Sequence, residues 1–283
     1  MGNFSFFEYS YNSIEKDPAE LFANLTTLGF VCRSRHIHSN VTVWAQNRCI
    51  FLLKDNHEYH GEGITGLGLM ISQDQLDECF EARIDPYTDF YVLSNEDNSF
   101  NFYLLPANGI DQFADNYMIL DDKQISNPGF DHFSGFVIDT DDASTIEIIN
   151  RMSKSSSELN NYTRYLLPNN QFSIFVENNS NSGVGTVVID TNDIFKSTSH
   201  LLLKQVELME FEDEEGNSFG KLAHKINGYN CKAFGNENSY SIENYIPKGS
   251  VNFNIIFRER KQYIKIREET LQYYDSVNTN QKK

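Results

Sequence analysis

One histidine stands near the start of a predicted strand in the stretch FDHFSGFVID, which begins at Phe130. The imidazole of His132 is a side chain that binds iron or zinc, and it is also one that packs in a core or lines a pocket. A metal site needs further ligands from neighbouring elements. The residues on the strands that complete the site therefore decide which of the two roles the sequence supports.

The other candidate ligands have no supporting pattern. His57 and His60 lie close together in the polar turn DNHEYH, where solvated histidines are expected. His200 falls on a predicted helix and His224 on a predicted loop or short strand, without ligand spacing between them. The four cysteines form no CxxC pair, which is typical of free thiols in a reducing compartment. There is also no Gly-x-Ser-x-Gly elbow and no phosphate-binding loop.

Composition excludes some classes of partner. The chain has 283 residues and a net charge of −17, which repels phosphate backbones, so no nucleic-acid partner is expected. Hydrophobic residues make up 40% of the chain, which is ample for packed cores. The sequence contains no signal peptide pattern and no apolar run of membrane-spanning length. A cytoplasmic protein without a membrane partner is therefore expected.

The elements that would position these residues follow one order, strand-helix-strand-strand-strand. In the first half, Asp17 and Pro18 are expected to cap a helix, and a tight hairpin turns at Asn47. Ser72 and Gln75 form a capping box for a second helix over residues 72–84. Further strands are predicted over residues 3–11, 63–72, 101–107 and 115–120. The polar stretches SKSSSELNN, ENNSNSG and FEDEEGNSFG are expected to be loops.

The same order restarts after residue 129, which indicates an internal duplication. The stretch FDHFSGFVIDTDDASTIEIINRM repeats the strand and helix of the chain's start. Likewise GVGTVVIDTNDIFKSTSHLLLKQV repeats GITGLGLMISQDQLDECFEARI. The polar segment 119–129, which ends in Pro-Gly, is the predicted boundary. The chain is therefore expected to form two modules, residues 1–120 and 129–283, with a closing helix at about 267–277.

Several fragments, taken in order, resemble one known family. LGF at 28–30, HIHSNVTVWAQNRCIFLLKDN at 36–56 and GEGITGLGLMIS at 61–72 carry the resemblance in the first module, and FDHFSGFV, GVGTVVIDTNDI and VNFNIIFRER carry it in the second. The family is that of 4-hydroxyphenylpyruvate dioxygenase and hydroxymandelate synthase, in the vicinal oxygen chelate superfamily. The resemblance implies an α+β fold of two tandem modules, each built of βαβββ repeats that form half-open barrels.

The resemblance also implies where an iron site would lie. The family holds Fe(II) with two histidines and one carboxylate, and leaves positions open for a 2-oxo acid and O₂. The matching positions are His132 for the first ligand, Thr186 for the second and Asn254 for the third. Glu259 is the carboxylate nearest to Asn254, but it has the opposite strand parity. Positions expected to line the pocket are Ser134, Val188, Ile256, Arg258 and Tyr274.

One imidazole with a hydroxyl and a neutral amide is not expected to retain Fe(II). The first hypothesis is therefore a dioxygenase-like protein that has lost its iron and its activity, needs no cofactor, and keeps a pocket for a small aromatic or oxo-acid ligand. No catalytic residue is assigned. Pairing of two copies into a homodimer is left open.

Two alternatives stay open beside this hypothesis. In one, the chain is an active Fe(II)-dependent dioxygenase that acts on an aromatic 2-oxo acid. Its rearranged triad would use His132, His224 or His200, and a carboxylate such as Glu259. In the other, the chain is a metal-free binding protein that sequesters a toxic compound, for which the acidic surface would suit a cationic ligand.

Overall fold

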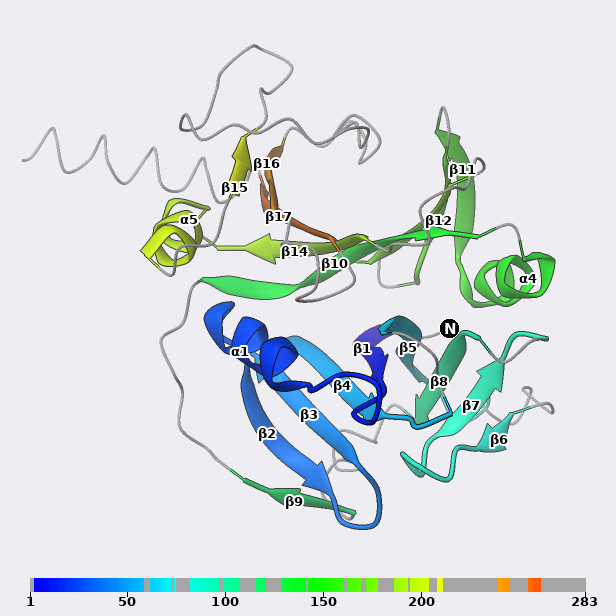
Figure 1. Ribbon diagram of the computed structural model, residues 1–283. Helices are drawn as coiled ribbons and strands as arrows, with labels where there is room; N and C mark the ends of the chain where they lie inside the picture. The colour runs from blue at the N-terminus through cyan, green and yellow to red at the C-terminus, as the bar shows by residue number, and fades with distance from the viewer. Residues whose placement is uncertain are drawn as a thin grey trace, which may run out of the picture.

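The computed structural model describes most of the first half of the chain and the central strands of the second half. The described residues are 3–58, 62–72, 74, 82–96, 99–106, 116–120, 129–140, 142–159, 162–168, 172–177, 186–192, 194–203, 208–210, 239–244 and 254–260. They form two curled sheets that lie against each other, with helices at their margins (Figure 1). None of the helices in these ranges is long and apolar enough to cross a membrane.

The first sheet, sheet A, has nine strands in the order β6-β7-β8-β5-β1-β4-β3-β2-β9. One helix, α1 (Ala19–Thr27), follows the first strand. The strands are β1 (Asn3–Tyr11), β2 (Val31–His36), β3 (Val41–Gln46), β4 (Cys49–Asp55), β5 (Gly63–Ile71), β6 (Arg83–Ile84), β7 (Tyr91–Ser94), β8 (Asn101–Pro106) and β9 (Tyr117–Ile119).

The second sheet, sheet B, has eight strands in the order β11-β12-β13-β10-β14-β17-β16-β15. Its helices are α4 (Ala143–Met152) and α5 (Ile194–Leu203). The strands are β10 (Phe130–Asp139), β11 (Ser155–Leu159), β12 (Tyr162–Leu166), β13 (Ser173–Glu177), β14 (Thr186–Thr191), β15 (Leu208–Glu210), β16 (Ser239–Asn244) and β17 (Asn254–Arg260).

Both sheets are built from the same repeat. Within a repeat, the first strand pairs in parallel with the last, as β1 does with β4 and β10 with β13. The first strands of two successive repeats then pair antiparallel at the centre of each sheet, β1 with β5 and β10 with β14. This arrangement confirms the expected fold class of tandem βαβββ repeats. The proposed boundary falls largely in residues 121–128, outside the described ranges, so the division into folding units stays a prediction.

Successive side chains of the central strands point to opposite faces of the sheet, and this divides the interior into two parts. On β1, Phe7 and Tyr9 belong to the main core, whereas Phe6 and Glu8 face the other way, into sheet A's own curl. The main core joins the two sheets through aromatic rings. Phe4 stacks on Phe172 with ring centroids 4.0 Å apart, and Phe7 meets Phe133 edge-on at 4.8 Å. The face of each sheet turned away from this main core is called its inner face below.

Local signals explain several elements. Asn47 turns the β3–β4 hairpin with a φ of 51°, a left-handed conformation that asparagine tolerates. Gly29, with a φ of 88°, ends the α1 segment. Asp142 caps α4, because its side chain accepts hydrogen bonds from the backbone N–H groups of Ser144 and Thr145.

Two predictions about local structure are wrong. The helix predicted over 72–84 extends too far, since Arg83 and Ile84 form edge strand β6 and pair with β7. The stretch SKSSSELNN was expected to be a loop, but Ser155–Leu159 forms β11 and pairs with β12 along its whole length. Pairing with a neighbouring strand overrides the weak strand preference of serine. The closing helix at 267–277 and the acidic stretch FEDEEGNSFG lie outside the described residues.

Candidate functional site

The central strands of sheet B arrange the predicted site positions in three rows. On β14, Val187 and Ile189 belong to the main core, so Thr186, Val188 and Asp190 occupy the inner-face positions. The first row joins Val137, Thr186 and Asn254, and the second joins Gly135, Val188 and Ile256. The third row joins His132, Asp190 and Arg258.

The rows separate the three positions at which the iron ligands were expected. Thr186 and Asn254 are direct Cα partners on neighbouring parallel strands. His132 is instead the partner of Asp190, which lies four residues beyond Thr186 on β14. Four residues of strand correspond to about 13 Å. The structure therefore brings Thr186 and Asn254 together and places His132 in a different row.

His132 is surrounded by charged groups at the junction of the two sheets. Its Nδ1 lies 3.0 Å from a carboxylate oxygen of Asp131 and 3.5 Å from the Arg48 guanidinium, while its Nε2 lies 3.6 Å from Asp190. Partial burial acts to raise the pKa of Asp131, but hydrogen bonds from Arg48 and His132 outweigh it and lower that pKa below its usual value. His132 Nε2 is buried and has no hydrogen-bond partner among the described residues.

The hairpin of sheet A contacts the first strand of sheet B at this point. Asn47 donates from its side chain to the Phe130 carbonyl, and the Arg48 backbone N–H donates to the Asp131 carbonyl at 3.2 Å. Arg48 and His132 form a β-bridge. The start of β10 is therefore paired with a segment that belongs to the first half of the chain.

The predicted pocket-lining residues differ in what they contact. Ser134 is buried and sits at a β-bulge, from which its hydroxyl donates to Asp190 at 2.6 Å. Val188 is buried in the second row. Ile256 and Arg258 hold inner-face positions by register, and the structure describes their backbone. Tyr274 lies outside the described residues.

The donor set at these positions does not fit Fe(II). Thr186 and Asn254 offer a hydroxyl and an amide, and neither carries the charge that a carboxylate ligand supplies. Asp190 is a carboxylate, but it accepts the Ser134 hydroxyl. Glu259 is the partner of Thr191, so it falls outside all three rows. No group of three or more metal-binding side chains occurs in the ranges that the structure describes.

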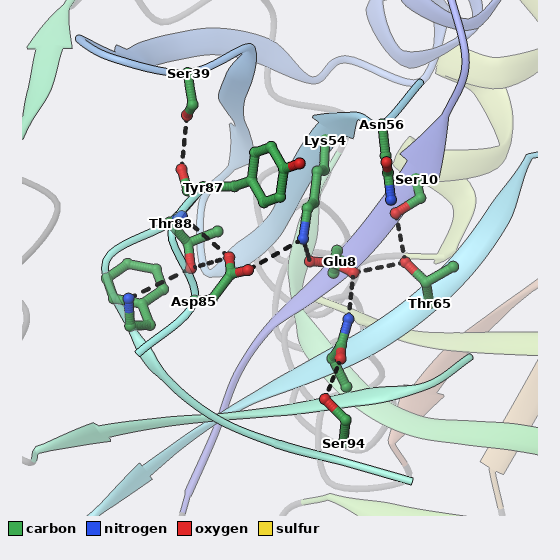
Figure 2. Close-up of polar contacts among 12 residues, drawn as sticks. Glu8, Ser10, Ser39, Lys54, Asn56, Thr65, Asp85, Tyr87, Thr88 and Ser94 are labelled. Atoms are coloured by element: carbon green, nitrogen blue, oxygen red, sulfur yellow. Dashed lines mark hydrogen bonds and ion pairs between the residues drawn. The ribbon is translucent and has the colours of Figure 1, made fainter. Parts of the chain in front are cut away.

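Sheet A holds a buried polar network that sequence reasoning missed. Glu8, on the inner face of β1, is fully buried. Its carboxylate accepts hydrogen bonds from the Thr65 hydroxyl at 2.6 Å, the Asn101 amide at 3.2 Å and the Tyr103 hydroxyl. The Lys54 ammonium lies 3.8 Å from the same carboxylate (Figure 2). Burial, and next the charge of Glu8, raise the pKa of Tyr103 well above its ordinary value, so its hydroxyl stays protonated.

The network extends from Lys54 to a turn between β6 and β7. Lys54 Nζ lies 3.4 Å from Asp85 and 4.6 Å from the centre of the Tyr87 ring. Asp85 in turn accepts the backbone N–H of Thr88 at 3.0 Å and its hydroxyl at 2.7 Å. One signal in the sequence was a glutamate in the middle of the apolar strand NFSFFEYSY, since buried carboxylates are rare unless they are paired.

A cavity of about 260 Å³ lies where β1 leads into α1. Tyr11 and Leu21 line it, together with the exposed ion pair that Lys16 makes with Glu62 at 2.7 Å. It shares no residue with the rows of sheet B or with the network around Glu8. The cavity therefore does not contribute to either site.

The comparisons with known proteins support the fold. The sequence matches no known protein family and no curated protein. The structure is similar to a fusion of a xylose isomerase-like TIM barrel with 4-hydroxyphenylpyruvate dioxygenase, at a TM-score of 0.66 and 12% identity, over 92% of this chain and 49% of that one. The chain therefore spans about half the length of that protein.

Two other solved structures match over most of both chains. One is a mutant 4-hydroxymandelate synthase from Streptomyces coelicolor, with a TM-score of 0.58, 14% identity and 92% of each chain covered. The other is a catechol 2,3-dioxygenase, with a TM-score of 0.54 and 8% identity over 90% of this chain and 87% of that one. The chain thus has the fold of the vicinal oxygen chelate dioxygenases. Identities this low show the fold alone.

Proposed function

We propose that this chain is a 4-hydroxyphenylpyruvate dioxygenase-like protein that does not hold Fe(II) and does not act as a dioxygenase. In this proposal the inner face of sheet B binds a small aromatic or oxo-acid ligand. The fold places this face where the two central strands of sheet B and β17 run side by side. Fold alone does not give function, so the proposal rests on the residues of that face.

The pairing of Thr186 with Asn254 is the observation that carries the proposal. These two positions face each other across neighbouring strands, yet they offer only neutral oxygen and nitrogen donors. Divalent iron in a dioxygenase needs imidazole and carboxylate ligands that offset its charge. His132 supplies an imidazole in another row, beside Asp190.

The same rows support a ligand of the proposed class. Val188 and Ile256 place apolar side chains at adjacent positions of the middle row, which suits contact with a ring. Arg258 occupies the next row. A guanidinium is the group best suited to bind a carboxylate through two parallel hydrogen bonds. A small acid with an apolar body would match this order of residues.

Iron retention tests the proposal. Purified protein is loaded with Fe(II) without oxygen, desalted, and analysed for metal. We expect less than about 0.1 iron per chain, because one imidazole with neutral donors binds Fe(II) too weakly to survive desalting. Stoichiometric iron after desalting, or oxygen uptake with 4-hydroxyphenylpyruvate, would contradict the proposal.

A pair of variants tests the register. The double change Thr186→His with Asn254→Glu puts an imidazole and a carboxylate on direct Cα partners, and we expect a gain of iron binding. The matched control is Thr186→His with Ile256→Glu, which separates the two groups by one row. Equal iron binding by both double variants would show that the rows do not define the metal geometry.

A further inference from the structure

A turn at the edge of sheet A covers the network around Lys54. This turn, called the lid below, comprises residues Asp85–Asp89 between β6 and β7. Its neighbour β6 is a two-residue edge strand, so few backbone hydrogen bonds anchor the lid on that side. Tyr87 and Asp89 in the lid are exposed, while Asp85 and Thr88 are buried beneath them.

The lid is bonded within itself more tightly than it is bonded to Lys54. Asp85 accepts two hydrogen bonds from Thr88, and the Asp89 N–H donates to the Asp85 carbonyl at 2.9 Å. By contrast, Asp85 lies 3.4 Å from Lys54 Nζ, longer than the 2.7–2.9 Å usual for an ammonium bonded to a carboxylate. The lid can therefore move away as a unit without breaking its own bonds.

The lid presents to Lys54 two groups that a small molecule could carry. Asp85 offers a carboxylate, and Tyr87 offers a phenol ring 4.6 Å from the ammonium (Figure 2). On the other side of Lys54 lies Glu8, which belongs to β1 and stays in place when the lid moves. When Asp85 leaves, Lys54 and Glu8 remain as a balanced pair with ammonium hydrogens free to bond.

The interior beside this pair is packed with aromatic rings. Phe6, Phe90, Tyr103 and Tyr117 belong to one buried cluster on the inner face of sheet A. Phe90 directly follows the lid and is 5.9 Å from Phe6, centre to centre. An anion with an aromatic body would find both its charge and its ring matched there.

We infer that the inner face of sheet A is a binding site for a small aromatic carboxylate, whose carboxylate takes the place of Asp85 on Lys54 while the lid opens. This site is separate from the one proposed on sheet B, and the inference does not depend on that proposal. The exchange conserves charge, because one carboxylate replaces another. In the closed form, the lid's own Asp85 and Tyr87 compete with the ligand.

Several contacts hold the lid closed. Ser39 Oγ donates to the Tyr87 carbonyl at 2.6 Å, and His36 Nε2 lies 3.0 Å from the Asp89 carboxylate. Asn116 also donates to Asp89, at 2.7 Å. Asp89 keeps a left-handed φ of 61°, which is uncommon outside glycine. These contacts reduce the open fraction, and apparent affinity falls in proportion to it.

Titration calorimetry with 4-hydroxyphenylacetate tests the site. We expect Asp85→Ala to bind this probe about tenfold more tightly than the unmodified protein, because the competing carboxylate is gone. Asp85→Ala with Lys54→Met should lose the gain completely. Ser39→Ala, which removes one of the contacts that hold the lid and does not touch Lys54, should give a gain of about twofold to threefold. The matched control Glu58→Ala removes an exposed carboxylate and should change nothing.

Equal affinity of Asp85→Ala and the unmodified protein would overturn the inference, and so would undiminished binding after Lys54→Met. Hydrogen exchange on the unmodified protein keeps the test valid if a variant does not fold. With 10 mM probe, the segment 85–90 should exchange faster, because the lid opens, while β4 should exchange more slowly. Unchanged exchange in both segments at that concentration would also overturn the inference.

Discussion

A buried carboxylate lies on a central strand of each sheet, and the two have different surroundings. Glu8 in sheet A receives three hydrogen bonds and lies 3.8 Å from the Lys54 ammonium. Asp190 in sheet B accepts the Ser134 hydroxyl and lies 3.6 Å from His132. The same repeat thus builds a cation-centred network in one sheet, and in the other an imidazole beside two aspartates, in a different row from the neutral side chains of Thr186 and Asn254. Chemistry in this fold is set by a few inner-face positions, and the strand framework stays the same.

The largest expected effect comes from removing the cation of sheet A. Lys54→Met leaves Glu8 and Asp85 buried without their counter-charge, which should lower the free energy of unfolding by about 3–5 kcal/mol. Urea denaturation measures the change. Lys16→Met breaks an exposed ion pair with Glu62 and should cost less than about 1 kcal/mol. Equal losses would mean that the network of sheet A does not depend on its cation.

A smaller loss of stability is expected when a central-strand glycine is replaced by alanine, and the loss should differ between Gly66 in sheet A and Gly135 in sheet B. A Cβ on Gly66 would lie 2.8 Å from the Asn101 carbonyl oxygen, so Gly66→Ala must shift β8. A Cβ on Gly135 would meet its nearest atom at 3.3 Å. We expect Gly66→Ala to cost about 1–3 kcal/mol and Gly135→Ala less than that. The melting temperatures of the two variants check this prediction. A larger drop for Gly135→Ala than for Gly66→Ala would contradict it.

The smallest effect concerns Asp142, which joins the sheets. It caps α4 and accepts a hydrogen bond from Asn95 of the first half at 3.2 Å. Removing the cap in Asp142→Ala should cost about 1 kcal/mol at pH 7. The hydrogen bond from the Thr145 hydroxyl is the main cause that lowers the pKa of Asp142 below its ordinary 3.8.

The pH dependence of that loss has a definite sign. Because the pKa is lowered in the folded state, the stabilisation is fully present above pH 3.8 and is lost as pH falls through the folded pKa. The deficit of Asp142→Ala should therefore stay constant from pH 7 to about 5 and shrink below pH 4. Urea midpoints measured across this range check it, and a deficit that grows toward acid would contradict it.

Periodicity and turn chemistry sufficed to predict the framework. The strand over residues 3–11, the hairpin at Asn47 and the repeating order of elements were readable, because each is fixed by residues close in sequence. The strand β11 was missed because its serines carry no apolar pattern, and pairing with β12 decides their conformation. Such pairing depends on residues that come later in the chain.

The candidate sites were less predictable for the same reason. The resemblance gave Thr186 and Asn254 as the second and third ligand positions; the structure makes them direct Cα partners, and their role in a site stays a prediction. The resemblance could not give the row of His132, because the bulges in β10 shift the register after Phe130 and Phe133. The network of sheet A was missed because Glu8, Lys54 and Asp85 come from three separate elements, and only the curl of the sheet brings them together.

The hairpin tip at Asn47 and Arg48 has a consequence for cooperativity. Because the Asn47 side-chain amide and the Arg48 backbone N–H donate to the Phe130 and Asp131 carbonyls, the start of β10 depends on the first half of the chain for these hydrogen bonds. The two sheets also share one aromatic core. We therefore expect calorimetry to record a single unfolding transition, with calorimetric and van't Hoff enthalpies in agreement. A single transition of this kind would define the two halves as one thermodynamic unit.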